Sequence, residues 1–247
     1  MALFEARHLH KRFGAQVVLE GINLSFEAGK LSGIMGPNGA GKTTCFNVLT
    51  GLHAPDRGSI HLDGRDITGL PPQRMAAIGV SRSFQIMSLF DDMLVLENVV
   101  LALPDFRRQR GRLGGAVFEN RGLTEAAIRV LDQVGLADRA WEKATALSYG
   151  ERRALEIAIA LAAEPRILFL DEPTSGLGGE STRKLAQLIG TLRGRYTIVV
   201  IEHDMQFLFS LADRISVIHW GQVIAEGAPD ALKANEWVAR SALGKVA

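Results

Sequence analysis

The residues from Gly36 to Thr44 have the types and the spacing that could hold a phosphate group. The run is Gly36-Pro37-Asn38-Gly39-Ala40-Gly41-Lys42-Thr43-Thr44, and it matches the pattern G-x-x-x-x-G-K-[ST] without a gap. The glycines let backbone N–H groups turn inward around a phosphate, because no Cβ stands in the way. Lys42 could then reach the outer phosphates of a nucleoside triphosphate, and the Thr43 hydroxyl could complete the shell of a Mg²⁺ ion.

The flanking residues predict the elements that such a loop requires. Leu31 to Met35 is an apolar run typical of a buried strand, and Cys45 to Thr50 predicts a helix that ends at Gly51. A helix N-terminus adds a partial positive charge beside the loop, which favours an anion. The alternative is a tight glycine turn beside a solvated lysine, which accounts less well for strand, loop and helix together.

Two carboxylates follow another predicted strand. Ile167 to Leu170 is continuously apolar, and Asp171 and Glu172 come directly after it. Ligands of open α/β sheets bind at the carboxyl ends of the strands, so both side chains are expected at such a site. Asp171 is suited to hold Mg²⁺ through water, and Glu172 is a candidate general base for an attacking water. The structural alternative is a pair of acids that cap a turn before Pro173.

Two further polar residues lie at predicted strand ends. His203 follows the apolar run Thr197 to Ile201, and Gln85 follows the run Ile78 to Phe84. At the same sheet edge, His203 could contact the γ-phosphate or the attacking water, although a hydrogen-bonded surface histidine is the simpler alternative. The neutral amide of Gln85 can donate to water and accept at a metal, so Gln85 could sense whether the γ-phosphate is present.

A second anion-binding device is predicted about a hundred residues beyond the first. In Leu147-Ser148-Tyr149-Gly150-Glu151, Ser148 and Glu151 have capping-box spacing at the start of a mainly apolar helix. The serine hydroxyl and the glycine amide at this helix N-terminus can bind an anion. A single triphosphate does not need two such devices in one chain. We therefore expect two chains to pair head to tail, each helix closing on the phosphate that the other holds.

Composition restricts the class of protein further. The chain has 247 residues, 47% of them apolar, with a formal charge of +1, which argues against a nucleic-acid binder that relies on bulk charge. Cys45 is the only cysteine, which excludes a disulfide framework or a thiolate zinc cluster. It is expected to be a small buried hydrophobe, with a reactive thiol of lowered pKa as the alternative. No apolar run approaches the roughly 18 residues of a membrane span, so we expect a soluble, intracellular chain.

The order of elements predicts an α/β fold with a mostly parallel sheet and an inserted lobe. Leu3 to Leu24 alternates loosely, as short antiparallel strands would, and Phe13 on this predicted hairpin is either a core residue or a platform for a base. From Asn98 to about Glu164 the spacing is helical. Continuous apolar strands separated by helices then return, which indicates a parallel sheet covered on both faces. The remaining predicted elements are the strands 59–64, 215–218 and 222–225 and the helices 123–134, 181–192 and 205–211.

These motifs, in this order and spacing, resemble the ATP-binding subunit of ABC transporters over essentially the whole chain. The resemblance implies one domain over residues 1–247 with a RecA-like P-loop NTPase core and an N-terminal antiparallel β subdomain. The core comprises 1–89 and 166–247, and the helical subdomain about 90–165. ATP and Mg²⁺ are the implied cofactors, with Thr43, Gln85 and Asp171 at the metal and Phe13 stacked on the adenine. Glu172 would be the catalytic base, and Ser148, Tyr149, Gly150 and Glu151 would act on the partner's nucleotide.

Several strings resemble the high-affinity branched-chain amino-acid uptake branch of that family. They include Ser83-Phe84-Gln85, the tyrosine of the 147–151 turn, and the run from Val200 to Met205. Urea, short-chain amide and lipopolysaccharide-export ATPases share several of them and remain alternatives. The resemblance implies a peripheral protein on the cytoplasmic face of the inner membrane. The implied partners are a second ATP-binding subunit, identical or homologous, integral permease subunits and, indirectly, an extracytoplasmic solute-binding protein, with no nucleic acid.

Two positions depart from the commonest family pattern. Tyr149 replaces the first glycine of the signature, and Gly178 stands where the dimer-contacting loop usually has Asp or Asn.

Two other classes of function agree less well with these motifs. A soluble ABC ATPase that acts on DNA or ribosomes usually has two cassettes or a long coiled coil, and this sequence has one phosphate loop and no sustained heptads. A phosphate-loop kinase or GTPase switch would not need the helix at Ser148.

Overall fold

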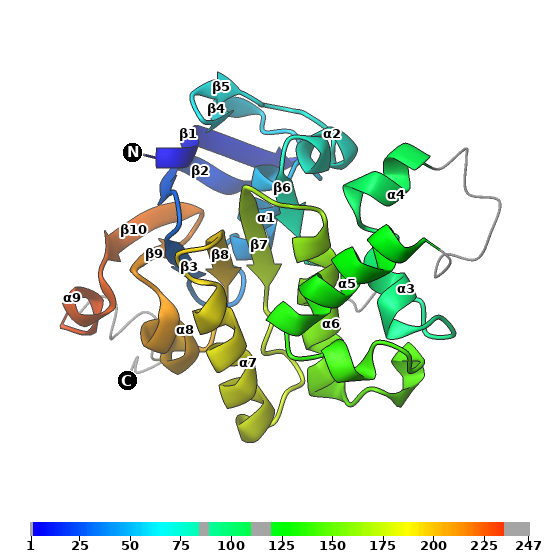
Figure 1. The fold of residues 1–247 in the computed structure, drawn as a ribbon. Helices are drawn as coiled ribbons and strands as arrows, with labels where there is room; N and C mark the ends of the chain where they lie inside the picture. The colour runs from blue at the N-terminus through cyan, green and yellow to red at the C-terminus, as the bar shows by residue number, and fades with distance from the viewer. Residues whose placement is uncertain (1, 84–88, 110–119, 235–247) are drawn as a thin grey trace.

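The computed structural model describes residues 2–83, 89–109 and 120–234. Its centre is a six-stranded sheet with the order β10-β9-β3-β8-β7-β6 (Figure 1). In chain order the strands are β3 (Leu31–Met35), β6 (Val80–Arg82), β7 (Ile167–Asp171), β8 (Thr197–Ile201), β9 (Arg214–His219) and β10 (Gln222–Gly227).

The central strands β3, β7 and β8 are parallel and buried along their whole length. Strands covered on both faces need apolar side chains at every position, which explains why their sequences are continuous rather than alternating. Strand β10 pairs antiparallel with β9 at the sheet edge, and its residues alternate between exposed and half-buried. The predicted α/β fold class with a mostly parallel sheet is confirmed.

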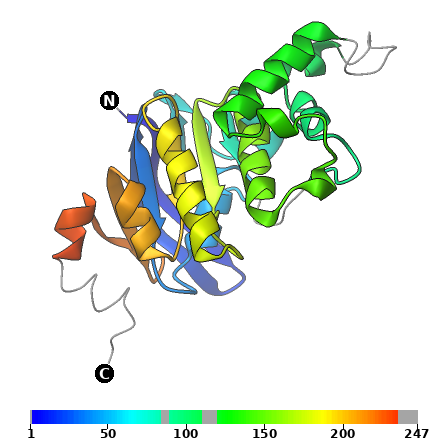
Figure 2. The same ribbon diagram turned by 60° about the horizontal axis from the view of Figure 1, so that its bottom comes forward.

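Alternate residues of each central strand enter two different hydrophobic clusters. In β7, Leu168 and Leu170 pack with the helices on one face. Ile167 and Phe169 pack with helix α1 (Lys42–Leu49) and the antiparallel sheet on the other face. Figure 2 shows the resulting layers, with α7 (Gly179–Leu192) and α8 (Met205–Leu211) in front of the sheet.

A second sheet has the order β2-β1-β4-β5 and is antiparallel. Its strands are β1 (Ala2–Phe13), β2 (Gln16–Glu27), β4 (Arg57–Leu62) and β5 (Arg65–Asp66). The prediction of short strands between Leu3 and Leu24 is wrong, because β1 and β2 each run for 12 residues. Register shifts interrupt their pairing, and His8 has a φ of 49°. These bulges shift the phase of the side chains, so one long strand gives the sequence pattern of several short ones.

The helices between β6 and β7 stand to one side of the sheets (Figures 1 and 2). The predicted helix 123–134 is present as part of α5, with Leu123, Ala127 and Leu131 buried in the same cluster as Leu168 of β7. The elements of this part are α3 (Val95–Val100), α4 (Pro104–Gln109), α5 (Arg121–Gln133), α6 (Tyr149–Ala162) and two 3₁₀ turns (Ala137–Arg139, Ala144–Ala146). The remaining helices are α2 (Pro72–Ala77) and α9 (Pro229–Lys233).

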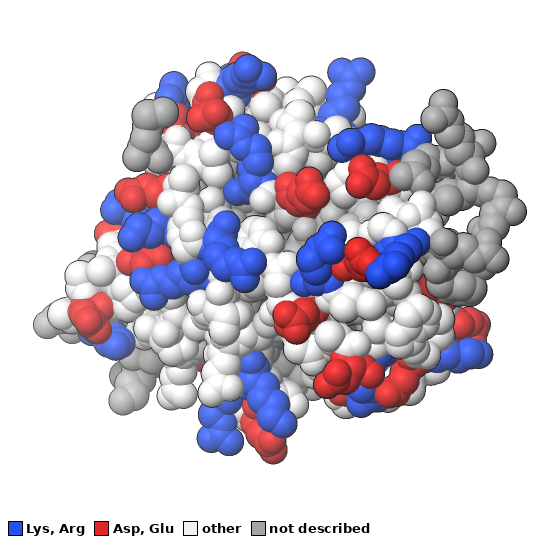
Figure 3. All heavy atoms as spheres, viewed as in Figure 1, with Lys and Arg blue, Asp and Glu red and all other residues white. Residues whose placement is uncertain are grey.

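Among the described residues, no helix combines the length and the apolar content that crossing a bilayer requires. On the described part of the face drawn in Figure 3, basic and acidic side chains are interspersed, as the formal charge of +1 leads one to expect.

One aromatic side chain connects the two sheets and the first helix. Phe169 of β7 is fully buried, and its ring centre lies 5.4 Å from that of Phe4, 6.1 Å from that of Phe26 and 6.1 Å from that of Phe46. All three contacts are edge-on, the geometry that aromatic quadrupoles favour. Phe169 thus fixes β7, and the carboxylates at its end, relative to the helix that follows the phosphate loop.

Phe169→Ala should lower the free energy of unfolding by about 3–5 kcal/mol, because it removes a buried ring and leaves a cavity between three elements. Urea or guanidinium unfolding followed by circular dichroism measures this change. Phe90→Ala is the control, since that ring is 57% exposed, and it should change stability by no more than about 0.5 kcal/mol. Equal midpoints for the two variants would contradict the role given to Phe169.

Candidate functional site

The phosphate loop leaves the end of β3 and enters α1 through positions that only glycine can occupy. A Cβ added to Gly36 would lie 2.0 Å from the carbonyl oxygen of Ile218. Gly41 has a φ of 98°, and a Cβ there would lie 2.9 Å from the carbonyl oxygen of Val18. Gly41 is also the N-cap of α1 and has no side chain to cap it, so the first N–H groups of the helix remain for an anion.

Lys42 lies on the inside of this loop. Its side chain is almost fully buried, and Nζ donates hydrogen bonds to the carbonyl oxygens of Gly36 (2.8 Å) and Pro37 (3.0 Å). Burial lowers the pKa of Lys42, and the nearby Glu172 and Asp171 oppose that shift. The oxygens of a phosphate are stronger acceptors than these carbonyls. The ammonium can therefore exchange its hydrogen bonds to the carbonyls for hydrogen bonds to phosphate oxygens.

Asp171 ends β7 at the carboxyl edge of the sheet and is only 4% exposed. Burial, and then the neighbouring charge of Glu172, raise its pKa to about 6, although Arg82 acts in the opposite direction. Carboxylate oxygens are ligands that Mg²⁺ prefers, so a carboxylate at this edge suits a divalent cation. Thr43, the second predicted ligand, lies exposed in the first turn of α1. The third predicted ligand, Gln85, lies outside the described residues.

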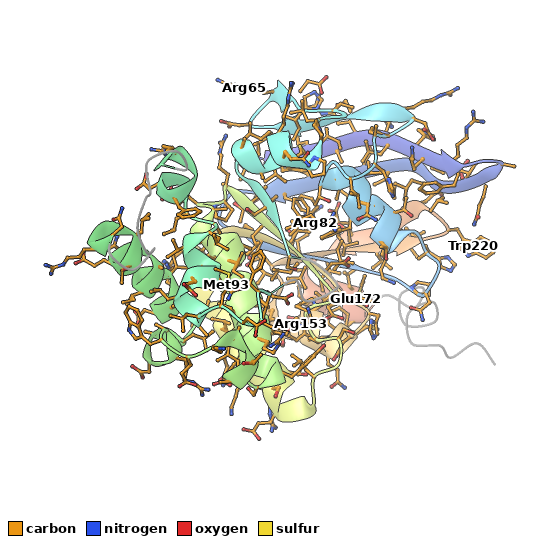
Figure 4. The ribbon with its side chains drawn as sticks, turned by 90° about the vertical axis from the view of Figure 1, so that its right-hand side faces the viewer. Arg65, Arg82, Met93, Arg153, Glu172 and Trp220 are labelled. Carbon is orange, nitrogen blue, oxygen red and sulfur yellow. The ribbon has the colours of Figure 1, made fainter. Side chains whose placement is uncertain are left out.

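Glu172 and His203 meet at the same edge from neighbouring strands. The Glu172 amide donates to the carbonyl oxygen of Ile201 (2.8 Å), and its backbone has a φ of 44°, an uncommon conformation for a residue with a side chain. Nδ1 of His203 lies 3.7 Å from Oε1 of Glu172, too far for a hydrogen bond. A single group that lies beside both side chains, such as a water or a phosphate oxygen, can contact the two of them. Figure 4 labels Glu172 at this edge.

Sequence reasoning missed Glu202, the fully buried carboxylate between β8 and His203. Its oxygens accept from the Thr174 amide (2.9 Å), the Thr174 hydroxyl (2.5 Å) and the His203 amide (3.1 Å). Three donors satisfy this buried charge. Glu202 thereby holds the chain just after Glu172 against the chain that presents His203. The only signal in the sequence was a carboxylate directly after a buried strand.

The predicted capping box at the start of α6 is present. The Ser148 hydroxyl accepts from the Glu151 amide (3.4 Å), and the Glu151 carboxylate accepts from the Ser148 amide (2.7 Å). Hydrogen bonding with Ser148 lowers the pKa of Glu151, and Arg139 adds to this shift. Ser148 and Gly150 border a cavity of about 400 Å³ whose walls come from α6, α7 and the turn after α5. The phosphate loop contributes no residue to that cavity, so the two anion-binding devices face different spaces.

The remaining predicted side chains lie nearer the rim or in the core. Tyr149 turns toward its own chain, where its hydroxyl donates to the carbonyl oxygen of Ser175 (3.2 Å). Phe13, at the end of β1, is 46% exposed and packs edge-on against His53, which leaves part of its surface open. Cys45 is fully buried, and burial raises its pKa to about 12, so the alternative of a reactive thiol is wrong.

A glycine loop with a buried lysine, a strand-end carboxylate pair and a parallel sheet define a nucleotide-binding protein of the phosphate-loop class. The chain matches the family model for ABC transporters over residues 19–175. It is 38% identical to the high-affinity branched-chain amino acid transport ATP-binding protein BraF of Pseudomonas aeruginosa, with 98% of each chain covered.

Solved structures agree with this assignment. The ADP conformation of the ATP-binding cassette MJ1267 superposes with a TM-score of 0.85 at 26% identity, covering 99% of this chain and 100% of that one. The dimeric bacterial ABC transporter cassette MJ0796 superposes with a TM-score of 0.74 at 27% identity, covering 92% of this chain and 98% of that one. The chain therefore belongs to the ABC transporter family, as one of its ATP-binding cassettes, and the resemblance stated from the sequence is confirmed.

Asp171→Asn should raise the melting temperature of the metal-free, nucleotide-free protein at pH 7.5 by roughly 2–4 °C, the equivalent of about 1 kcal/mol. The pKa of Asp171 in the folded chain is about 6, above its ordinary value of 3.8. The charged form therefore opposes folding above pH 6, and this penalty fades as the pH falls through 6 toward 4. Scanning calorimetry with a chelator should show the advantage of the variant shrinking at pH 5.

Asp132→Asn is the control for that measurement, because Asp132 is an exposed residue of α5. It should change stability by less than about 0.5 kcal/mol at either pH. An Asp171→Asn advantage that was the same at pH 7.5 and pH 5 would show that its origin is packing and not charge.

Proposed function

We propose that this chain hydrolyses MgATP as one of two paired cassettes and thereby powers solute uptake through a membrane permease. The observation that carries the proposal is the meeting of Lys42, Asp171, Glu172 and His203 at one sheet edge, while the Ser148 turn opens onto a different cavity. One chain thus holds two incomplete parts of a nucleotide site.

In the proposed mechanism, water attacks the γ-phosphate in line with the leaving oxygen. Glu172 orients the water and takes its proton, and His203, with Nδ1 3.7 Å from the Glu172 carboxylate, contacts the γ-phosphate from the neighbouring strand. Lys42 gives its hydrogen bonds to the phosphate oxygens and balances their charge. Mg²⁺ held by Asp171 and Thr43, together with the predicted contribution of Gln85, would neutralise the transferring group. Phe13 would stack on the adenine.

The partner would complete the site with its own Ser148 turn. The hydroxyl of Ser148, the amide of Gly150 and the N-terminus of α6 together suit a phosphate, and all of them lie in a turn that is exposed or half-buried. ATP would then draw two cassettes together because each triphosphate bridges the interface. Hydrolysis would remove the bridge, and a permease would convert the opening into transport.

The solute and the partners are proposed from the likeness to BraF. We assign the chain to the uptake of branched-chain amino acids or a related small polar solute, on the cytoplasmic face of the inner membrane. Its partners would be an identical or homologous cassette, permease subunits and, indirectly, a solute-binding protein. In this proposal residues 1–89 and 166–247 form the catalytic core, and the subdomain of about 90–165, together with Gln85, receives the permease.

Glu172→Gln should leave the affinity for MgATP within about threefold of wild type and lower turnover by at least about 10²-fold, because the amide cannot take the proton from water. The bound ATP should persist and trap a dimer. Phosphate release and light scattering measure the two effects. Hydrolysis near the wild-type rate would remove Glu172 from the role of base.

Two controls accompany this variant. Glu125→Gln changes an exposed carboxylate of α5, which pairs with Arg121 at 2.8 Å, and should keep wild-type turnover. Ser148→Arg, placed in the Glu172→Gln background, should prevent the trapped dimer, since it fills the turn that would face the partner's phosphate. A dimer that formed equally well with Ser148→Arg would contradict the proposed pairing.

A further inference from the structure

Tyr149 makes contacts within its own chain that completing the partner's site does not require. It is the first residue of α6, next to Ser148, and its side chain reaches back to the loop that follows β7. There its hydroxyl donates to the carbonyl oxygen of Ser175 at 3.2 Å. Helix α6, which is proposed to contact the partner's nucleotide, is thus hydrogen-bonded to the loop that follows Glu172.

The loop is shaped to receive this ring. Gly176 has a φ of 77°, and a Cβ there would lie 2.8 Å from the Tyr149 hydroxyl oxygen and 3.2 and 3.3 Å from two ring carbons. Any side chain at position 176 would therefore displace the tyrosine as well as strain the backbone. The glycine and the tyrosine fit each other across two elements.

A buried ion pair fixes the other side of the phenol. The Arg153 guanidinium lies 5.7 Å from the centre of the Tyr149 ring, and its Nη2 donates to the tyrosine oxygen at 3.5 Å. Arg153 in turn pairs with Glu156 at 2.8 Å, and both side chains are more than nine-tenths buried. Because the oxygen accepts from Arg153, its own proton is left for Ser175. Figure 4 shows Arg153 of α6 and labels Glu172 in the same region of the molecule.

From Ser175 the connection to the catalytic carboxylate is short. The Ser175 amide donates to the carbonyl oxygen of Glu172 at 3.0 Å, and the adjacent Thr174 is bound by Glu202. The loop is thus held by β8 through Glu202 and by α6 through Tyr149. Glu202 and Glu172 directly follow neighbouring strands of one sheet, whereas Tyr149 belongs to the helices beside the sheet. Of these two contacts, only the one from Tyr149 changes when the helices move relative to the sheet.

We infer that Tyr149 is a positioning residue that couples the two nucleotide sites of a cassette pair. When the Ser148 turn engages the partner's nucleotide, the Tyr149–Ser175 hydrogen bond sets the loop that carries Glu172 of the same chain. Occupation of one site thereby promotes hydrolysis at the other. This inference rests on the proposed function, because it needs two cassettes that complete each other's sites.

Tyr149→Phe tests the inference, since it removes the hydroxyl and keeps the ring. The maximal rate of ATP hydrolysis should fall about 5- to 10-fold, the loss expected for one hydrogen bond, with the KM for ATP within about twofold of wild type. The Hill coefficient for ATP should fall toward 1. Tyr196→Phe is the matched control, because it removes a tyrosine hydrogen bond to Gln133 (2.9 Å) far from the loop, and it should leave rate and cooperativity unchanged.

Mixed pairs of differently tagged chains locate the effect. When the partner chain carries Glu172→Gln, only the Tyr149→Phe chain can hydrolyse with its own base, and single-turnover cleavage should slow. When Glu172→Gln and Tyr149→Phe are in the same chain, only the partner's site is active. The rate of cleavage at that site should equal the rate in a pair whose inactive chain carries Glu172→Gln alone. The reverse pattern would show that Tyr149 acts on the partner's nucleotide and would overturn the inference.

The outcomes also separate this inference from the proposed function. Cooperative hydrolysis by wild type that Tyr149→Phe leaves unchanged in rate and Hill coefficient would overturn the coupling role, while the paired ATPase would stand. A wild-type chain that binds MgATP but neither pairs nor hydrolyses it, alone or with a co-expressed homologous cassette, would overturn both.

Discussion

The site depends on one buried ammonium that lies among three carboxylates. Parallel strands place Lys42 after β3, Asp171 at the end of β7 and Glu202 after β8, with Glu172 beside them. In a poorly solvated edge these carboxylates repel one another, and the raised pKa of Asp171 reports that repulsion together with burial. A triphosphate adds further negative charge. The proposed Mg²⁺ would offset part of that charge.

The remaining structure holds that edge in place from several directions. The phosphate loop fits because Gly36 and Gly41 have no Cβ where the backbone of β9 and β2 approaches. Phe169 fixes β7 against α1 and the antiparallel sheet. Two side chains from different elements, Glu202 and Tyr149, anchor the loop after Glu172. The charged side chains thus lie at or just beyond strand ends, and contacts from neighbouring elements fix the loops that follow them.

Sequence reasoning succeeded where local pattern determines structure. The buried strands β3, β7 and β8 are continuous apolar runs, so they were predictable. The capping box was predictable because Ser148 and Glu151 are close in sequence. The 12-residue strands β1 and β2 were not, because bulges break the alternation from which strand length is inferred. Glu202 was missed because two of its three donors come from Thr174, which only the fold brings near. Spacing alone could not decide the surroundings of Cys45.

The fit between Tyr149 and Gly176 has a consequence for how such a chain can diverge. Because a side chain at 176 and a ring at 149 claim the same space, residue 176 cannot be enlarged while the ring is present. A lineage that replaces Gly176 with a larger residue must therefore first replace Tyr149 with a smaller one. The intermediate has lost the contact between helix and loop, so the order of the two substitutions is constrained, and the two positions are expected to vary together among descendants.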